Sequence, residues 1–241
     1  MNKYEVILLD LDDTLIDNLE NVKYAYKKMV EFVGHEYTKE GFDRWYNLDK
    51  QYWIDFSNQK LDVPLEYKSN HDDYVKYVRS LRYMLYFNNE ITLQTAFEIN
   101  DLYLESLNEL IIPVKGAKEI LEYLHSKYKL VIATNGPTSA VESKLKKIGC
   151  LEFIDTIFSA DMTIHEVTKP DKRYFEELED FINCHNLEKL LIIGDSLHSE
   201  IQGGMNAGID CIWFNRFHEN LKKQYKPTHI IENLMELKNI L

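Results

Sequence analysis

The residues of this sequence that are best placed to do chemistry are two carboxylates near the N-terminus. Asp10 and Asp12 directly follow residues 6–9, whose sequence Val-Ile-Leu-Leu is typical of a buried strand. Ionised carboxylates are costly to bury unless a cation or hydrogen-bond donors accompany them. In an open sheet of parallel strands, ligands bind just beyond the carboxyl ends of the strands. The pair therefore indicates an enzyme that uses two carboxylates and a cation.

Three further polar motifs lie where a strand should end or a helix should begin, namely Thr134-Asn135-Gly136, Lys169-Pro170 and Gly194-Asp195. The carboxyl ends of parallel strands share one edge of a sheet, so these motifs can converge with the carboxylate pair. Together they offer a nucleophile, an acid/base, a hydroxyl with backbone donors, a cation and a metal-binding carboxylate. That set is what phosphoryl transfer to a carboxylate requires.

The elements that must position these motifs alternate between strand and helix. Buried strands are predicted at residues 4–9, 130–134, 156–159, 190–193 and 211–214. Helices are predicted at residues 116–127, from Pro137 to Gly149, at 171–183, and from Ser196, as the capping residue, to Gly208. This alternation predicts an α/β fold with a parallel sheet that is covered by helices on both faces.

Between the first strand and the next, the sequence shows only helical patterns. They cover residues 19–33, 42–56, 72–87 and 92–110. A chain that starts in the sheet, leaves it for helices and then returns implies an insertion. We expect a core domain of residues 1–16 and 110–241 with an inserted α-helical cap domain of residues 17–109.

The insertion is rich in aromatic residues, among them Trp45, Tyr52 and Trp53. Their simplest interpretation is the core of the cap, although a nucleobase could also stack there. Arg79 and Arg82 are three positions apart on one predicted helix face. They could reach a substrate anion, but we expect them on a solvated face.

Composition narrows the classes of partner. The 241 residues include 28 Lys and Arg against 40 Asp and Glu, for a formal net charge of −12. This balance argues against a nucleic-acid polymer or an anionic membrane as partner, but leaves room for a small phosphorylated metabolite. The three cysteines are scattered without metal or redox spacing, and no secretion signal or membrane-length apolar run is seen. We therefore expect a cytoplasmic protein; the sequence indicates no oligomeric state.

At these residues the chain resembles the haloacid dehalogenase superfamily of phosphotransferases. The resemblance implies a Rossmann-like three-layer core with strand order 5-4-1-2-3. Longer stretches are similar to the pyrimidine 5′-nucleotidase group and to the N-acylneuraminate-9-phosphatase group. The matching superfamily motifs are Asp10-x-Asp12-x-Thr14, Thr134, Lys169, and Gly194-Asp195 followed by an acidic residue at Glu200.

The resemblance also implies roles. Asp10 would attack phosphorus, Asp12 would act as acid and then base, and Thr14 would be a structural hydrogen-bonding residue. Thr134 and Lys169 would bind and neutralise the phosphoryl group. The remaining substrate contacts would come from Leu11, Asn135 and Gly136.

The cofactor implied by the resemblance is Mg²⁺, which suits oxygen ligands. Its ligands would be Asp10, the backbone carbonyl of Asp12, and Asp195, with Glu200 in or near the outer shell. The superfamily usually has Asp at position 200, so Glu200 is a departure. The sequence does not distinguish between a role for Glu200 near the metal and a position on the surface of the helix.

The sequence thus predicts a Mg²⁺-dependent phosphomonoester hydrolase, with a pyrimidine nucleoside 5′-monophosphatase as the best assignment. A phosphatase of sugar phosphates or acyl-sugar phosphates is the first alternative. Asp12 and Asp195 argue against a dehalogenase, and a phosphomutase is disfavoured. A phosphate-binding regulatory protein without turnover is the alternative of another class, and only Glu200 supports it.

Overall fold

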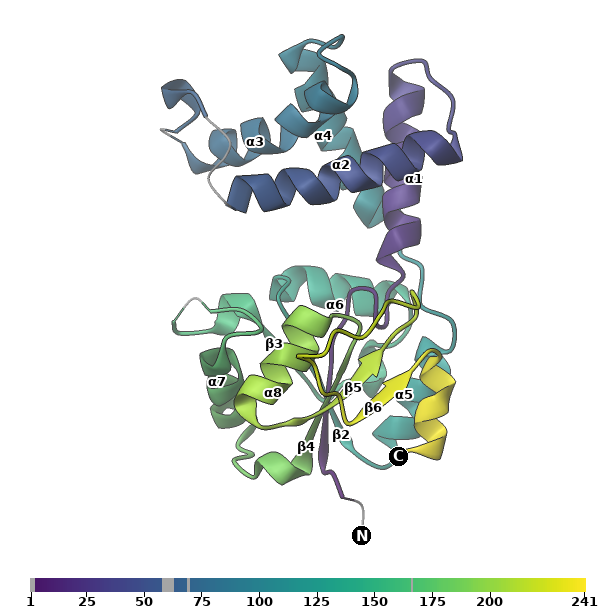
Figure 1. The fold of residues 1–241 in the computed structure, drawn as a ribbon, viewed down its shortest axis with the longest axis vertical. Helices are drawn as coiled ribbons and strands as arrows, with labels where there is room; N and C mark the ends of the chain where they lie inside the picture. Colours follow the sequence, from purple (N-terminus) through teal and green to yellow (C-terminus); the bar gives the residue numbers. More distant parts are fainter. Residues whose placement is uncertain (1–2, 58–62, 69, 166) are drawn as a thin grey trace. The chain divides into compact units, whose positions relative to one another are not determined.

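The computed structural model describes residues 3–57, 63–68, 70–165 and 167–241. The chain forms two compact units (Figure 1). The first, here called the sheet unit, comprises Met1–Asn18 and Ile111–Leu241, and the second, the helical unit, comprises Leu19–Leu110. In the described part of the chain, no helix is both long and apolar enough to span a membrane.

The sheet unit is built on a parallel sheet in the order β3-β2-β1-β4-β5-β6. Its strands are β1 (Val6–Leu9), β2 (Lys129–Thr134), β3 (Thr156–Ser159), β4 (Leu190–Gly194), β5 (Asp210–Phe214) and β6 (His229–Ile231). The predicted order 5-4-1-2-3 is confirmed, and β6 adds a further strand at the edge next to β5. That strand escaped prediction because it has three residues, two of them exposed.

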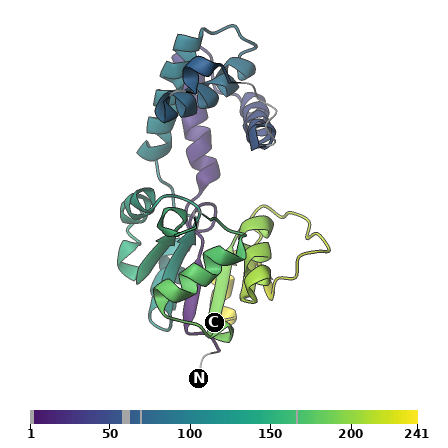
Figure 2. The same cartoon turned by 90° about the vertical axis from the view of Figure 1, so that its left-hand side faces the viewer.

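Helices cover both faces of this sheet, as the alternation predicts (Figure 2). Their bounds are α5 (Ala117–His125), α6 (Thr138–Lys147), α7 (Lys172–Ile182) and α8 (Gly203–Ala207). Successive residues of β1 point to opposite faces. Ile7 and Leu9 share one apolar core with α5 and α6, whereas Val6 and Leu8 share the other with α7 and α8.

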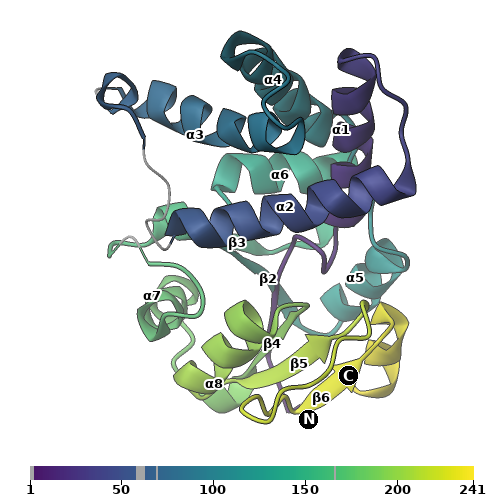
Figure 3. The same cartoon turned by 45° about the horizontal axis from the view of Figure 1, so that its top comes forward.

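The helical unit contains α1 (Asn18–Phe32), α2 (Lys39–Ser57), α3 (His71–Tyr86) and α4 (Leu93–Glu109), with a short 3₁₀ helix at Leu65–Tyr67. Helix α3 packs against both α2 and α4 (Figure 3). Trp45 is fully buried between aromatic rings. The ring of Tyr83 is stacked on it with a centroid distance of 5.3 Å, and the ring of Tyr103 meets it edge-on with a centroid distance of 5.6 Å. The prediction that Trp45 and Tyr52 form core is confirmed, since both are buried.

The prediction of a solvated face is wrong for Arg82, which is only 6% exposed. Its Nη1 lies 2.5 Å from Oδ1 of Asp49. Its guanidinium group also lies over the rings of Trp45, Trp53 and Tyr83, at 5.6, 5.3 and 4.9 Å from their centroids. The packing of α3 against two helices buries this face, and the ion pair with Asp49 compensates the buried charge.

Candidate active site

A cavity of about 180 Å³ lies at the carboxyl ends of the central strands of the sheet unit. The motif residues predicted to converge do so here. Lining the cavity are Asp10, Asp12, Thr134, Asn135, Gly136, Lys169, Asp195 and Glu200, together with Ser196 and Ser199. Leu11 is absent from this lining because its side chain is 1% exposed and packs in the apolar core. A contact between Leu11 and a ligand would therefore have to come from its backbone.

Asp10 is placed by the strands on either side of it. It directly follows β1, and its backbone N–H group donates to the carbonyl of Ile193 in β4 at 3.0 Å. Beyond it the chain turns tightly, since the N–H groups of both Leu15 and Ile16 donate to the carbonyl of Leu11. Thr14 is fully buried in this turn, and its hydroxyl donates to Oδ2 of Asp10 at 3.3 Å. The carboxylate is therefore fixed from both its strand and the following turn.

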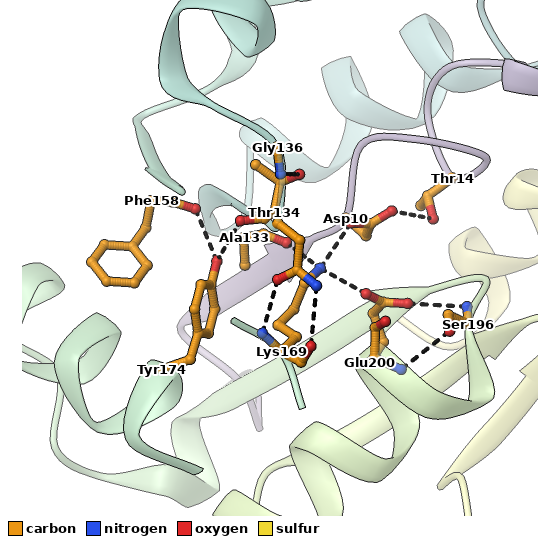
Figure 4. Close-up of polar contacts among 12 residues, drawn as sticks. Asp10, Thr14, Ala133, Thr134, Gly136, Phe158, Lys169, Tyr174, Ser196 and Glu200 are labelled. Carbon is orange, nitrogen blue, oxygen red and sulfur yellow. Dashed lines mark hydrogen bonds and ion pairs between the residues drawn. The ribbon is translucent and has the colours of Figure 1, made fainter. Parts of the chain in front are cut away.

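Lys169 is the central cation of the site (Figure 4). Its Nζ donates to Oδ1 of Asp10 at 2.8 Å, to Oε1 of Glu200 at 2.6 Å and to the carbonyl of Ala133 at 2.6 Å. Burial lowers the pKa of Lys169, but the attraction of Asp10 and Glu200 outweighs it, and the pKa is raised overall. Lys169 is therefore a permanent positive charge beside Asp10.

Glu200 points into the site and is 1% exposed, so the alternative of a helix-surface residue is wrong. Its Oε1 accepts from Lys169 and its Oε2 accepts from the backbone N–H group of Ser196 at 3.0 Å. The side chain fits only because residue 194 is glycine. A Cβ atom there would lie 2.2 Å from Cγ of Glu200. The turn Leu197–Gln202 is a π-helix, and its wider geometry presents Glu200 inward.

Asn135 links the strand-end motif to the lysine motif. Its side-chain Nδ2 donates to the carbonyl of Lys169 at 3.1 Å, and its Oδ1 accepts from the N–H group of Lys169 at 2.8 Å. Thr134 is 2% exposed, and its Oγ1 accepts from the N–H group of Gly136 at 3.1 Å. The amide of Asn135 therefore holds the Lys169 segment in place rather than pointing freely at a ligand.

The carboxylates of Asp10, Asp195 and Glu200 offer oxygen atoms that all lie within 4.8 Å of one another. Burial, with Asp10 and Glu200 nearby, raises the pKa of Asp195 to about 8. Burial also raises the pKa of Asp10 to about 7, against the opposing effect of Lys169. Among the described residues, Lys169 is the cation within this group, and no positive side chain pairs with Asp195. The donor set and its excess negative charge fit a divalent cation with oxygen ligands.

Lys144 belongs to the site, but the sequence reasoning missed it. Its Nζ lies 2.5 Å from Oδ1 of Asp12, and it comes from the last turn of α6. A signal was present, since Lys144 follows the buried Val141 by three positions and precedes the buried Leu145. That spacing places the lysine at the margin of the face that α6 packs on the sheet.

Comparisons with known proteins identify the family of this chain. Residues 7–214 match the family model described as haloacid dehalogenase-like hydrolase. The pyrimidine 5′-nucleotidase PynA of Streptococcus pneumoniae is 29% identical, with 99% of this chain and 97% of that protein covered. The N-acylneuraminate-9-phosphatase of Mus musculus is 22% identical, with 100% and 95% covered.

A solved structure shows the same fold over its whole length. The HAD-hydrolase YfnB of Bacillus subtilis, described as bound to magnesium, matches with a TM-score of 0.83 and 26% identity. The match covers 100% of this chain and 99% of that one. The chain therefore belongs to the haloacid dehalogenase-like hydrolase family.

Proposed function

We propose that this protein is a Mg²⁺-dependent phosphomonoester hydrolase that works through an aspartyl-phosphate and acts on pyrimidine nucleoside 5′-monophosphates. The observation that carries the chemistry is the buried arrangement of Asp10 beside Lys169, with Asp195 and Glu200 close by. It supports a role for Asp10 as the nucleophile, in a pocket that Thr134 and Lys169 also line.

In the first step, a carboxylate oxygen of Asp10 attacks phosphorus and the bond from phosphorus to the ester oxygen breaks. Asp12 gives its proton to the departing alkoxide, which leaves as an alcohol. Thr134 and the backbone N–H groups that follow it bind the phosphoryl oxygens. Lys169 neutralises part of their charge, and because its Nζ is fixed by three acceptors it needs little rearrangement during the reaction.

In the second step, water attacks the phosphorus of the aspartyl-phosphate. Asp12, now ionised, takes a proton from this water, and the bond from phosphorus to the Asp10 oxygen breaks. Inorganic phosphate leaves and the carboxylate of Asp10 is restored. The sum of the two steps is the hydrolysis of a phosphomonoester to an alcohol and phosphate.

Mg²⁺ would be held by Asp10, the backbone carbonyl of Asp12, and Asp195. Bound there, it would supply charge neutralisation between the carboxylates and the phosphoryl oxygens. The two oxygens of Glu200 accept from Lys169 and Ser196, which supports a place for Glu200 in or near the outer shell of the metal. The same contacts show how Glu at this position keeps Lys169 in place. That favours an active enzyme over a phosphate-binding protein without turnover.

The helical unit would be the cap domain that the sequence predicts. The chain leaves the sheet unit a few residues after Asp12, and the N–H group of Asp17 donates to the carbonyl of Ile112 at 2.8 Å. The outgoing and returning segments are thus joined beside the catalytic turn.

The substrate class rests on the likeness to PynA over nearly the whole chain. A phosphatase of acyl-sugar phosphates is the second candidate, since the N-acylneuraminate-9-phosphatase also matches over the full length. A panel of phosphomonoesters, assayed for phosphate release with Mg²⁺ and with EDTA, separates them. We expect UMP and dTMP to give higher kcat/KM than AMP and the sugar phosphates. A sugar phosphate at the top of the panel would replace the substrate and retain the chemistry.

A further inference from the structure

The ion pair between Lys144 and Asp12 has a consequence for catalysis. Asp12 is the proposed acid and base, so the direction of its carboxylate decides whether a proton can reach the leaving group. Its Oδ1 lies 2.5 Å from Nζ of Lys144, and the two side chains are 34% and 20% exposed. One carboxylate oxygen is therefore engaged from the side of α6.

The lysine comes from a helix that is held firmly against the sheet unit. Val141 and Leu145 of α6 are buried in the apolar core. The first residue of the helix is also fixed, because the N–H and hydroxyl groups of Thr138 donate to the carboxylate of Asp161 at 3.1 and 2.9 Å. Lys144 thus extends toward Asp12 from a backbone that is anchored at both ends.

The backbone of Asp12 is held as well. It pairs with Ile16 across the turn, and the N–H group of Asp13 donates to the carbonyl of Ile16 at 2.7 Å. With both backbones fixed, the remaining freedom lies in the two side chains, and the contact restricts it. When Asp12 carries a proton on Oδ2, its Oδ1 still accepts from Nζ of Lys144, so the contact orients the acid form as well as the ionised form. A partly exposed pair adds little to stability, so we look for its effect in catalysis.

We propose that Lys144 is a positioning residue, which holds the Asp12 carboxylate so that its other oxygen faces the leaving group of the substrate. This inference rests on the proposed function, because it needs Asp12 as the acid. Without Lys144, Asp12 would occupy several orientations and would protonate the leaving alkoxide in only some of them. Esters that require this proton should then suffer most.

The test compares two leaving groups in Lys144→Met and in wild type. The ester bond of a nucleoside 5′-monophosphate breaks to an alkoxide that needs a proton, whereas p-nitrophenyl phosphate releases a stable phenolate. The quantity to measure is kcat/KM, because it reports only the steps up to phosphoenzyme formation. We expect kcat/KM of the variant to fall about tenfold for the nucleotide and by less than about threefold for the aryl ester.

Two further variants make the comparison specific. Lys144→Arg keeps a cation at this position and should restore most of the loss with the nucleotide. Lys146→Met removes an exposed lysine from the same helix and should leave both substrates and the unfolding temperature unchanged. An equal loss on both esters, no loss, or a faster Lys144→Met enzyme would overturn the inference. A wild-type enzyme without activity on any ester would instead overturn the proposed function.

Discussion

The carboxylate of Asp195 should make the metal-free protein less stable as the pH rises. Burial, Asp10 and Glu200 raise the pKa of Asp195 from 3.8 to about 8. The folded protein therefore holds a proton on Asp195 that the unfolded chain has already lost above pH 4. Because the folded state binds more protons than the unfolded state across this window, the free energy of unfolding falls as the pH rises from about 4 to about 8.

The size of this effect follows from the same values. The interval between 3.8, the usual pKa of Asp, and pH 7 is about three pH units, and each unit is worth about 1.4 kcal/mol. Asp195 therefore lowers the free energy of unfolding by at most about 4 kcal/mol at pH 7. Asp195→Asn removes this cost. For a protein of this size, each kcal/mol raises the unfolding temperature by roughly 2–4 °C, so the metal-free variant should unfold up to about 16 °C higher at pH 7.

The assay is thermal unfolding in EDTA and in Mg²⁺ between pH 5 and pH 8. We expect the advantage of Asp195→Asn in EDTA to grow with pH. In wild type, Mg²⁺ at one hundred times its dissociation constant should add about 2.7 kcal/mol, and the variant should gain much less at the same concentration. Asp180→Asn is the matched control, since that side chain is 80% exposed and should change neither quantity. A metal-free Asp195→Asn protein that is less stable than wild type at pH 8, or one that keeps the full response to Mg²⁺, would refute the reasoning.

Three further variants test other contacts. Lys169→Met leaves Asp10 and Glu200 buried without their cation. The variant should release no phosphate, and urea unfolding at pH 8 in EDTA should show a loss of about 3 kcal/mol of stability. An active variant would argue against the role of Lys169. Gly194→Ala places a Cβ atom 2.2 Å from Cγ of Glu200. Because this displaces Glu200, kcat should fall at least about tenfold. Normal kinetics would show that Glu200 is dispensable. Arg82→Met leaves Asp49 without its buried partner and should destabilise the helical unit by about 3 kcal/mol in chemical denaturation. Arg79 is less deeply buried, so Arg79→Met should have a small effect. Equal effects of the two substitutions would contradict the assignment of Arg82 to the core.

The strands and the residues at their ends were predictable because short-range patterns determine them. An apolar run followed by a carboxylate or a threonine marks both the strand and its functional edge, as at Asp10, Thr134 and Asp195. The two adjacent glycines at 203 and 204 also have a reason in close packing, since a Cβ atom on Gly204 would lie 2.4 Å from Sγ of Cys211.

What the sequence could not reveal depends on contacts between distant segments. Asp12 and its partner Lys144 are 132 positions apart, and the buried Arg82 finds Asp49 at a distance of 33 positions on another helix. No local pattern links such pairs. The inward direction of Glu200 depends on a π-helical turn, whose periodicity differs from the α-helical spacing used for prediction.

The central claim is that phosphate is transferred to Asp10 before it reaches water, and a direct test is to trap that intermediate. The enzyme would be mixed with its best phosphomonoester and Mg²⁺, quenched in acid during turnover and reduced with borohydride, which converts an aspartyl-phosphate into homoserine. Peptide mass spectrometry then identifies the reduced residue. The account predicts homoserine at position 10 in wild type and neither homoserine nor phosphate release in Asp10→Asn. Turnover without modification of Asp10, or an active Asp10→Asn enzyme, would contradict it.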